Sequence, residues 1–188
     1  MSMFTFSEFP EIETPRLRLR ETQPSDAEDI LQILSQPEVV RFYNIGPLTK
    51  IEEAQALVKR RNVAYTEGTR IRWAIVLNET NRVVGSCGYG YADSESRQAE
   101  IGYELDPAHW GHGLMREALT AMLDFGFKTI HLNRIEALVV PQNTASRNLL
   151  SRLGFQEEGL LRERGFWKGA YHDLALYALL RRDWSLLP

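Results

Sequence analysis

The sequence has little of what marks secreted, membrane-spanning or nucleic-acid-binding proteins. Its single cysteine, Cys87, has no second cysteine with which to form an internal disulfide. The longest apolar run, Leu174 to Leu180, is far shorter than the roughly 20 residues that a membrane-spanning helix needs. A net charge of -3 argues against general nucleic-acid binding, which usually shows as an excess of lysine and arginine. The first residues also lack the basic and apolar regions of a signal peptide, so we expect a cytoplasmic protein.

The length and composition suit one globular domain. The chain has 188 residues, of which 44% are hydrophobic and 25% charged, as in an ordinary domain with its own core. The sequence contains no internal repeat, low-complexity stretch or linker. We therefore expect a single domain over residues 1–188.

The first third of the sequence predicts a strand followed by two helices. From Arg16 to Glu21 charged and apolar residues alternate, as in a strand with one buried face. The sequence Pro24-Ser25-Asp26 offers a cap for a helix that should end before Pro37. Thr49 is positioned to cap the second helix, with Glu52 completing a capping box.

The centre of the sequence predicts antiparallel strands. Residues 73–77 form the first strand. After a turn, residues 83–91 form a second strand whose glycines indicate the close approach of another backbone or of a ligand. A third strand is predicted over residues 99–105, and its alternation places Glu100 on the face opposite Ile101.

Gly111 and Gly113 stand directly before an amphipathic helix. The glycines permit a tight turn, and apolar residues recur at helical spacing from Leu114 onward. The first turn of such a helix offers unpaired N–H groups and the positive end of the helix dipole, which together bind phosphate. A plain turn is the alternative, since a Gly-x-Gly pair alone is weak evidence. Arg116, a cation in the first turn, is better explained if an anion lies nearby.

The last third of the sequence predicts a strand, a helix and a hairpin. The strand covers residues 134–140, Asn143 caps the helix that follows, and Gly154 ends it. Strand-like residues then lead to a turn at Lys168-Gly169 and to a final strand over residues 173–180.

These elements and motifs resemble the GNAT superfamily of acyl-coenzyme A-dependent N-acetyltransferases, in particular its RimJ/RimL-like branch. The resemblance rests on segments that follow one another in the family's order and together cover nearly the whole chain. They are Thr14 to Arg20, Ala99 to Tyr103, Trp110 to Gly113, Asn143 to Ser146 with Leu153 to Phe155, and Tyr171 to Asp173. No single segment is specific, but the ordered set is.

The resemblance implies an α+β fold with a mixed, mostly antiparallel sheet of about seven strands that splays open, flanked by about four helices. It also implies acetyl-coenzyme A as the acyl-donor substrate and no metal. The pantothenate arm would pair with the backbone of Tyr103, Glu104 and Leu105. The other residues expected to contact the coenzyme are Gly111, His112, Gly113, Leu114, Met115, Arg116 and Asn143. One departure from the family pattern is Ala108, where glutamine or arginine is usual.

Attack of an amine on a thioester needs a base for the amine, and an acid can protonate the departing thiolate. By resemblance Ser146 lies near the sulfur, whereas the tyrosine that many relatives use as the acid is replaced by Leu150. Glu100, beside the expected cleft, is the first choice for the base, and Glu163 is the second. Two alternatives stay open: Ser146 can simply satisfy the start of a helix, and Glu100 can face solvent or pair with an arginine.

Other polar and aromatic residues are weaker candidates. His109 and His112 lie three residues apart, but no cysteine or carboxylate completes a metal-ligand set at an accepted spacing. Cys87 is more typical of a strand in the core than of a nucleophile. The aromatic residues that either line an acceptor pocket or pack in the core are Phe42, Tyr43 and Trp73.

The leading acceptor implied by the resemblance is the N-terminal α-amine of a protein, with a ribosomal protein as one candidate. A small amine, such as a polyamine, an amino acid or an antibiotic, is the competing substrate class. A coenzyme A-binding regulatory module without catalysis is the rival of a different class. Relatives are often homodimers, but the sequence identifies no interface.

Overall fold

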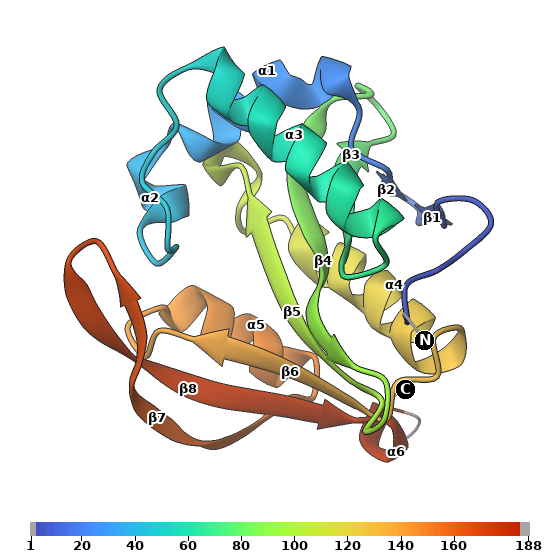
Figure 1. Cartoon of the computed structure of the whole chain (residues 1–188), viewed down its shortest axis with the longest axis vertical. Helices are drawn as coiled ribbons and strands as arrows, with labels where there is room; N and C mark the ends of the chain where they lie inside the picture. Colours follow the sequence, from blue (N-terminus) through green and yellow to red (C-terminus); the bar gives the residue numbers. More distant parts are fainter. Residues whose placement is uncertain (1–2, 185–188) are drawn as a thin grey trace.

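A computed structural model describes residues 3–184 as an α+β fold built on one eight-stranded sheet with the order β1-β2-β3-β4-β5-β6-β8-β7 (Figure 1). The strands are β1 (Ile12–Glu13), β2 (Leu17–Arg20), β3 (Ile71–Leu77), β4 (Val83–Asp93), β5 (Gln98–Leu105), β6 (Arg134–Val139), β7 (Gln156–Trp167) and β8 (Ala170–Leu180). All neighbours are antiparallel except β5 and β6, which are parallel. The expected mixed, mostly antiparallel sheet is confirmed, and the two-residue β1 is its one unexpected strand.

Six α-helices accompany the sheet in the described part of the chain. They are α1 (Ala27–Leu34), α2 (Pro37–Val40), α3 (Ile51–Thr66), α4 (Leu114–Lys128), α5 (Thr144–Arg152) and α6 (Arg181–Trp184). The sequence predicted all but the short α2 and α6. Pro37 does end the first helix, but it also begins α2, because proline is well tolerated in the first turn of a helix. No helix within residues 3–184 is long and apolar enough to cross a membrane.

The β5 and β6 strands lie side by side only at their beginnings. Residues 98–100 of β5 pair with residues 134–136 of β6, and the strands then diverge, as Figure 1 shows. Each keeps its other neighbour, since β5 continues along β4 and β6 continues along β8. The sheet therefore splays into two arms, with a gap between them.

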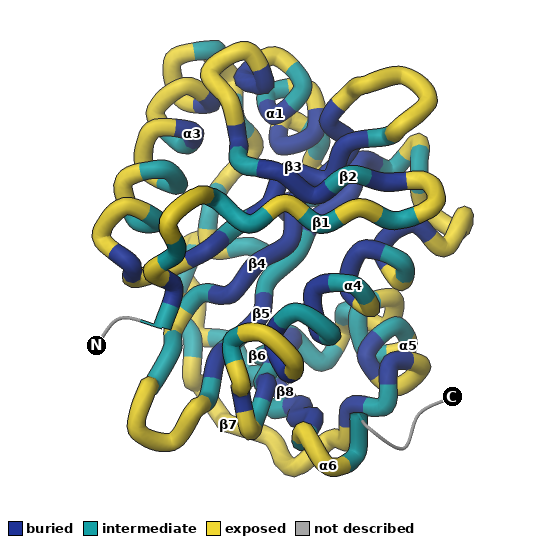
Figure 2. The backbone as a smooth tube through the Cα atoms, turned by 90° about the vertical axis from the view of Figure 1, so that its right-hand side faces the viewer, coloured by how far each residue is buried: buried dark blue, intermediate teal, exposed yellow. Residues whose placement is uncertain are grey.

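Helices cover both faces of the arm that runs from β2 to β5. Figure 2 shows α3 on one side of the strands and α4 and α5 on the other. The core under α4 and α5 contains Trp73, Cys87 and Tyr89, whereas α1 and α3 pack on Ala74 and Val76. Cys87 is fully buried, and burial raises the pKa of its thiol to about 12, so the expectation of a core cysteine is confirmed.

The start of α3 differs from the expected one by a single residue. Glu53, rather than Glu52, accepts hydrogen bonds from the N–H groups of Thr49 and Lys50, at 2.7 and 3.1 Å. The helix therefore begins at Ile51, after Lys50 in the N-cap position. The predicted pairing of Thr49 with Glu52 was wrong because adjacent glutamates fit the capping pattern equally well.

The β7–β8 hairpin closes one edge of the sheet. Its turn residues, Lys168 and Gly169, have φ values of 51° and 76°, and two successive positive values characterise a type I′ turn. The predicted turn is thereby confirmed. Between Leu161 and Gly165, β7 bulges out of register with β8. β7 is exposed along most of its length (Figure 2).

Two glycines of β4 let the neighbouring strands come close, as the sequence indicated. A Cβ atom added at Gly85 would collide with the carbonyl oxygen of Glu104, and one added at Gly88 would collide with that of Ile71. Both obstacles are backbone atoms of neighbouring strands. Close strand packing, rather than a ligand, therefore accounts for these glycines.

Gly88→Ala should lower the free energy of unfolding by about 1–3 kcal/mol, the usual cost of overpacking a core. Gly46→Ala is the matched control, because a Cβ atom at Gly46 would meet nothing within 4 Å. Urea denaturation of both variants and the wild type measures the difference. Equal stability of all three proteins would contradict this account of Gly88.

Candidate active site

Backbone groups of β5 line one side of the gap. In an antiparallel pair the N–H and C=O groups of successive residues point alternately toward the partner strand and away from it. The N–H of Asp106 donates to the carbonyl of Val84 at 2.8 Å, so Glu104 turns its backbone toward β4. The same alternation turns the backbone groups of Tyr103 and Leu105 toward the gap. Two of the three residues expected to pair with the coenzyme therefore present their backbone there.

The backbone carbonyl groups of Tyr103 and Leu105 at this edge already accept hydrogen bonds from side chains. The hydroxyl of Tyr43 donates to the carbonyl of Tyr103 at 2.7 Å, and the indole N–H of Trp110 donates to that of Leu105 at 2.8 Å. No side chain within residues 3–184 accepts a hydrogen bond from the N–H groups of Tyr103 and Leu105. The gap consequently offers donors, and a ligand with carbonyl groups suits it better than one that brings only N–H groups.

A 3₁₀ turn, Pro107–His109, carries the chain from β5 to the glycine loop. Asp106 caps this turn by accepting a hydrogen bond from the N–H of Ala108 at 3.0 Å. Gly111 and Gly113 then adopt φ values of 79° and 76°, which other residues rarely adopt. Gly113 is the N-cap of α4 and has no side chain with which to cap it. The predicted order of glycine loop and helix is confirmed, and the first N–H groups of α4 remain uncapped.

The residues of this segment divide into two groups. Gly111, His112 and Arg116 are exposed, whereas the side chains of Leu114 and Met115 are buried in the core. Leu114 and Met115 can therefore reach a phosphate only through their backbone N–H groups. Arg116 forms no ion pair with a carboxylate of the described residues. Its positive charge, in the first turn of α4, is therefore not neutralised by a protein carboxylate.

Tyr103 and Ser146 meet between β5 and α5. Their hydroxyl oxygens lie 2.6 Å apart, and either group can donate. The backbone N–H of Ser146 donates to the side chain of Asn143 at 3.2 Å, which confirms Asn143 as the helix cap. Burial raises the pKa of Tyr103 to about 12, although the hydrogen bond with Ser146 acts in the opposite direction. Tyr103 is therefore a neutral hydroxyl near pH 7 that can exchange a proton with Ser146.

Leu150 lies in the core rather than at the surface of the site. Its side chain is fully buried beneath α5, among the residues that pack against α4. The position where many relatives have a tyrosine therefore carries no titratable group. Ser146 and Tyr103 are the hydroxyl groups that the structure brings together on this side of the gap.

Glu100 lies beside Glu136, a residue that the sequence did not single out. They are direct neighbours on the parallel strands β5 and β6, so their side chains share a face, the one opposite Ile101. Glu136 accepts hydrogen bonds from Gln98 at 2.9 Å and from Arg134 at 2.6 Å. The pairing could not be predicted because nothing in the sequence specifies which strands run parallel.

Three charged neighbours and burial set the pKa of Glu100. Burial is the main reason that its pKa is raised, and the charge of Glu136 raises it further. Arg164 and Arg70 act in the opposite direction. Glu100 is thus a half-buried carboxylate at the place where the strands separate, with a greater proton affinity than an ordinary glutamate.

Glu163, the second candidate for the base, lies in the bulge of β7. It is exposed, has a φ value of 52°, and donates its backbone N–H to the carboxylate of Asp173 at 2.7 Å. No contact within residues 3–184 joins its side chain to Glu100 or Ser146. The structure brings Ser146 together with Tyr103 and Glu100 together with Glu136, but it does not bring Glu163 to either pair.

The side chain of Glu104 belongs to a buried polar cluster on the α3 face. Its carboxylate contacts the guanidinium groups of Arg61 and Arg72 and the hydroxyl groups of Ser86 and Tyr43. Burial alone would raise the pKa of Glu104, but Arg72 and Arg61 lower it to about 2, assisted by the two hydroxyl groups. This cluster holds Tyr43 against the β5 backbone. Tyr43 also packs against the core under α1 and α3, so it contacts both the β5 edge and the core.

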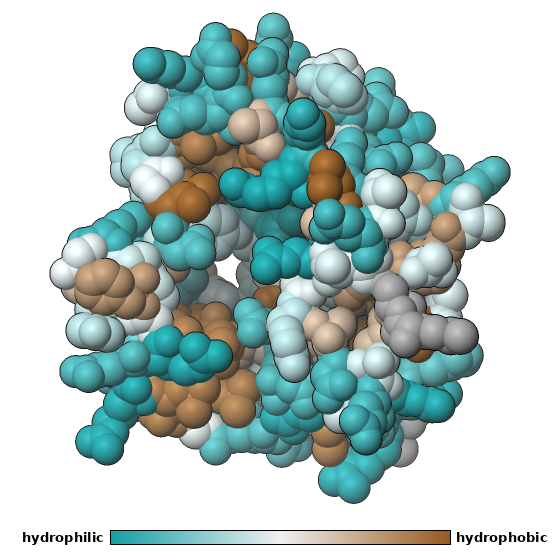
Figure 3. Space-filling model, viewed as in Figure 1, coloured by the Kyte–Doolittle hydropathy of each residue, from teal (hydrophilic) through white to brown (hydrophobic). Residues whose placement is uncertain are grey.

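The tip of the β7–β8 hairpin contacts α2, so the two arms of the sheet are joined there. Lys168 donates its ammonium group to the carbonyl of Val40, the last residue of α2, at 2.8 Å. Figure 3 shows the molecule hollowed between the two arms, with apolar side chains gathered below the hollow. Leu138 and Leu176, paired on β6 and β8, contribute to the same face as Glu136. Glu100 shares this face through its pairing with Glu136.

Among the described residues, no group of three or more histidine, cysteine, aspartate or glutamate side chains could hold a metal ion. His112 is exposed between the two glycines of the loop, whereas His109 is half-buried and lines a pocket beside Asp29 and Val83. Of the two histidines, His112 is therefore the one exposed at the loop.

Known proteins agree with this geometry. Residues 16–156 match the family model described as acetyltransferase (GNAT) domain. The uncharacterized N-acetyltransferase p20 of Bacillus licheniformis is 42% identical over 172 residues, which are 92% of this chain and 97% of that protein. The ribosomal protein uS5-alanine N-acetyltransferase of Escherichia coli is 31% identical over 132 residues, 70% of this chain and 68% of that protein.

A solved structure extends the similarity to the fold. Mycobacterium smegmatis RimJ in complex with CoA-disulfide superposes with a TM-score of 0.83 at 26% identity, covering 96% of this chain and 89% of that one. The family match spans the strands from β2 to β6, the glycine loop and α5. The chain therefore belongs to the GNAT acetyltransferase family and is an acyl-coenzyme A N-acyltransferase.

Proposed function

We propose that this protein transfers the acetyl group of acetyl-coenzyme A to the N-terminal α-amine of a protein, with a ribosomal protein as the leading acceptor. The observation that carries the proposal is the gap between β5 and β6, with uncapped N–H groups at the loop that follows β5. In this proposal residues 1–188 act as one domain, since a single sheet contributes both sides of the gap.

The coenzyme would lie along β5 like an added strand. Amide carbonyls of its pantetheine arm would accept hydrogen bonds from the N–H groups of Tyr103 and Leu105. Its pyrophosphate would lie on the N–H groups from Gly111 to Arg116, where the helix dipole favours negative charge. Asn143, at the start of α5, would border the arm near its sulfur end. Acetyl-coenzyme A is a substrate here and not a resident cofactor.

Glu100 would act as the base from the α3 face. An α-amine with a pKa of about 7.8 is neutral in roughly one molecule in seven at pH 7, whereas a lysine amine with a pKa of about 10.4 is neutral in roughly one in 2,500. A carboxylate base can therefore serve an α-amine more readily than a lysine. Glu163 is the weaker choice because its side chain is exposed on the hairpin.

Ser146 and Tyr103 would supply the acid from the opposite face. As the amine nitrogen bonds to the acetyl carbon, its proton passes to Glu100, directly or through water. The carbon–sulfur bond then breaks, and the thiolate takes a proton from Ser146, which Tyr103 replaces through their hydrogen bond. Exchange with water returns Glu100 and Tyr103 to their starting states.

Two observations support a protein N-terminus as the acceptor. One is the similarity to the ribosomal protein uS5-alanine N-acetyltransferase. The other is the bridge between Lys168 and α2, which joins the two arms at the open end of the gap (Figure 1) and favours a slender chain end over a side chain on a folded surface. A small amine is the competing acceptor, and a module without catalysis is the competing function.

A thiol-release assay with acetyl-coenzyme A tests the proposed function. The amines to compare are peptides with free N-termini, the same peptides with blocked N-termini and an internal lysine, polyamines, free amino acids and aminoglycosides. We expect the largest kcat/KM with free N-termini. Preference for a small amine would replace the proposed acceptor. Coenzyme binding without turnover on any amine would favour the regulatory module.

Ser146→Ala and Tyr103→Phe should each lower kcat about tenfold or more, the scale expected for groups that transfer a proton. Because the two hydroxyls share one proton path, the double variant should be little worse than the worse single variant. Ser151→Ala, at an exposed position of the same helix, is the control and should retain wild-type kcat. Additive losses in the double variant would contradict a shared path.

The acidic limb of the pH–rate profile should report Glu100. Removing the negative charge in Glu136→Gln lowers the pKa of Glu100, so this limb of kcat/KM should move to lower pH. Removing the positive charge in Arg164→Gln should move it to higher pH. Glu158→Gln, which changes another carboxylate bound to Arg134, is the control and should leave the limb in place. Movement in the same direction in both test variants would exclude Glu100 as the titrating base.

A further inference from the structure

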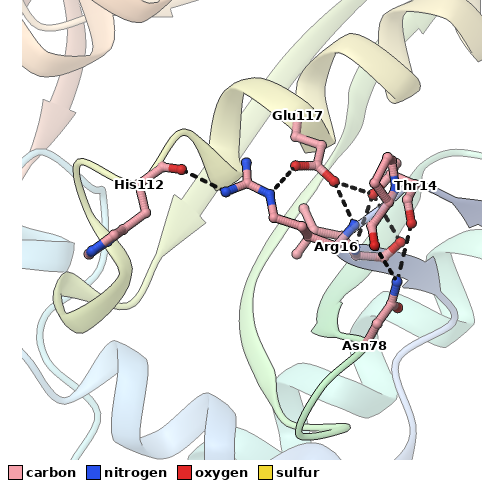
Figure 4. Close-up of polar contacts among 7 residues, drawn as sticks. Thr14, Arg16, Asn78, His112 and Glu117 are labelled. Carbon is pink, nitrogen blue, oxygen red and sulfur yellow. Dashed lines mark hydrogen bonds and ion pairs between the residues drawn. The ribbon is translucent and has the colours of Figure 1, made fainter.

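Arg16, directly before β2, lies against the glycine loop although almost one hundred residues separate them in sequence. Figure 4 shows its guanidinium between the side chain of Glu117 and the backbone of His112. Its Nε donates to Glu117 at 2.6 Å, and its Nη1 donates to the carbonyl of His112 at 2.9 Å. The backbone N–H of Arg16 also donates to Glu117, at 2.9 Å. One residue thus binds both the loop and the first turns of α4.

We infer that Arg16 is a positioning residue of the coenzyme site: it holds the loop with its N–H groups free for the pyrophosphate and adds a cation beside them. The inference rests on the proposed coenzyme site. It assigns a role to a residue that the sequence predicted only as an outward-facing arginine of a strand.

The loop carbonyl is the first reason for this role. A loop that binds phosphate through N–H groups must turn its carbonyl oxygens away from the anion. The hydrogen bond from Arg16 holds the carbonyl of His112, which lies between the two glycines of positive φ. Without this bond the flexible glycines could reorient the peptide groups of the loop. Arg16 therefore favours the arrangement that a phosphate needs.

The charge of Glu117 is the second reason. A carboxylate near the start of a helix is favourable in the dipole but would repel a phosphate at the same end. Both of its oxygens accept hydrogen bonds, one from the guanidinium of Arg16 and the other from the hydroxyl of Thr14 at 2.7 Å and the backbone N–H of Arg16. Burial alone would raise the pKa of Glu117, but the hydrogen bonds of Thr14 and Arg16 lower it, so it stays ionised. Arg16 neutralises this charge beside the proposed anion site.

The remaining nitrogen of the guanidinium is the third reason. Nη2 lies 3.7 Å from where a Cβ atom of Gly113 would be, and no described residue accepts a hydrogen bond from it. The side chain of Arg16 is 50% exposed, so this nitrogen can reach a bound anion without breaking its other contacts. Asn78 holds the segment before β2 in place, because its side-chain amide donates to the carbonyl of Thr14 at 3.1 Å.

Truncated donors separate this role from a general structural one. Arg16→Gln should raise the KM for acetyl-coenzyme A about tenfold or more with little change in kcat, whereas kcat/KM for acetylpantetheine, which has no pyrophosphate, should stay the same. Arg16→Lys should give a smaller rise, since an ammonium keeps the charge but loses the guanidinium fork. Arg18→Gln is the matched control on the same strand, because Arg18 binds Asn81 away from the loop.

Three outcomes would overturn the inference. An unchanged KM for acetyl-coenzyme A in Arg16→Gln would show that the exposed pair with Glu117 is a surface ion pair of little consequence. Equal losses with both donors would show a structural defect. Calorimetry that detects no coenzyme A binding to the wild type would contradict the proposed function itself, which distinguishes that failure from a failure of the role of Arg16.

Discussion

The divergence of β5 and β6 after Glu100 is the constraint on which the rest of the site depends. Strand edges carry N–H and C=O groups that must find partners when they are removed from water. Here the carbonyl groups of Tyr103 and Leu105 are satisfied by Tyr43 and Trp110, while their N–H groups face the gap without a side-chain partner in the described residues. A ligand with extended amide groups could pair with this edge. Because β5 leads directly into the glycine loop, the same ligand could also reach the N–H groups at the start of α4.

The two faces of the sheet divide the proposed chemistry. Tyr103 and Ser146 meet on the face of α4 and α5, whereas Glu100 and Glu136 share the face of α3 and the hairpin. A coenzyme in the gap would have its sulfur near the first pair and its acetyl carbon open to an amine from the second face. The proposed acid and the proposed base are thereby kept apart, so neither would neutralise the other. The buried cluster around Glu104 supports this division by fixing Tyr43 against β5.

Local signals predicted most of the elements, and long-range pairing set the limit. The glycines before α4, the cap at Asn143 and the turn at Lys168 are short patterns whose backbone requirements can be recognised directly, and the structure has all three. The contacts of Glu136 with β5 and of Arg16 with the glycine loop and α4 could not be predicted, because these segments meet only in the fold. Tyr103 was expected for its backbone, yet its hydroxyl contacts Ser146. The capping glutamate of α3 was predicted wrongly for a different reason: Glu52 and Glu53 are adjacent and both fit the capping pattern, and Glu53 accepts the hydrogen bonds.

A crystal structure with bound coenzyme A tests the central claim most directly, because the claim concerns where one ligand lies. We predict the pyrophosphate within hydrogen-bond distance of the N–H groups between Gly111 and Arg116, and the pantetheine arm between β5 and β6 with its carbonyls on Tyr103 and Leu105. The sulfur should lie near Ser146. Coenzyme bound outside the gap, or with its phosphates away from the glycine loop, would contradict the account.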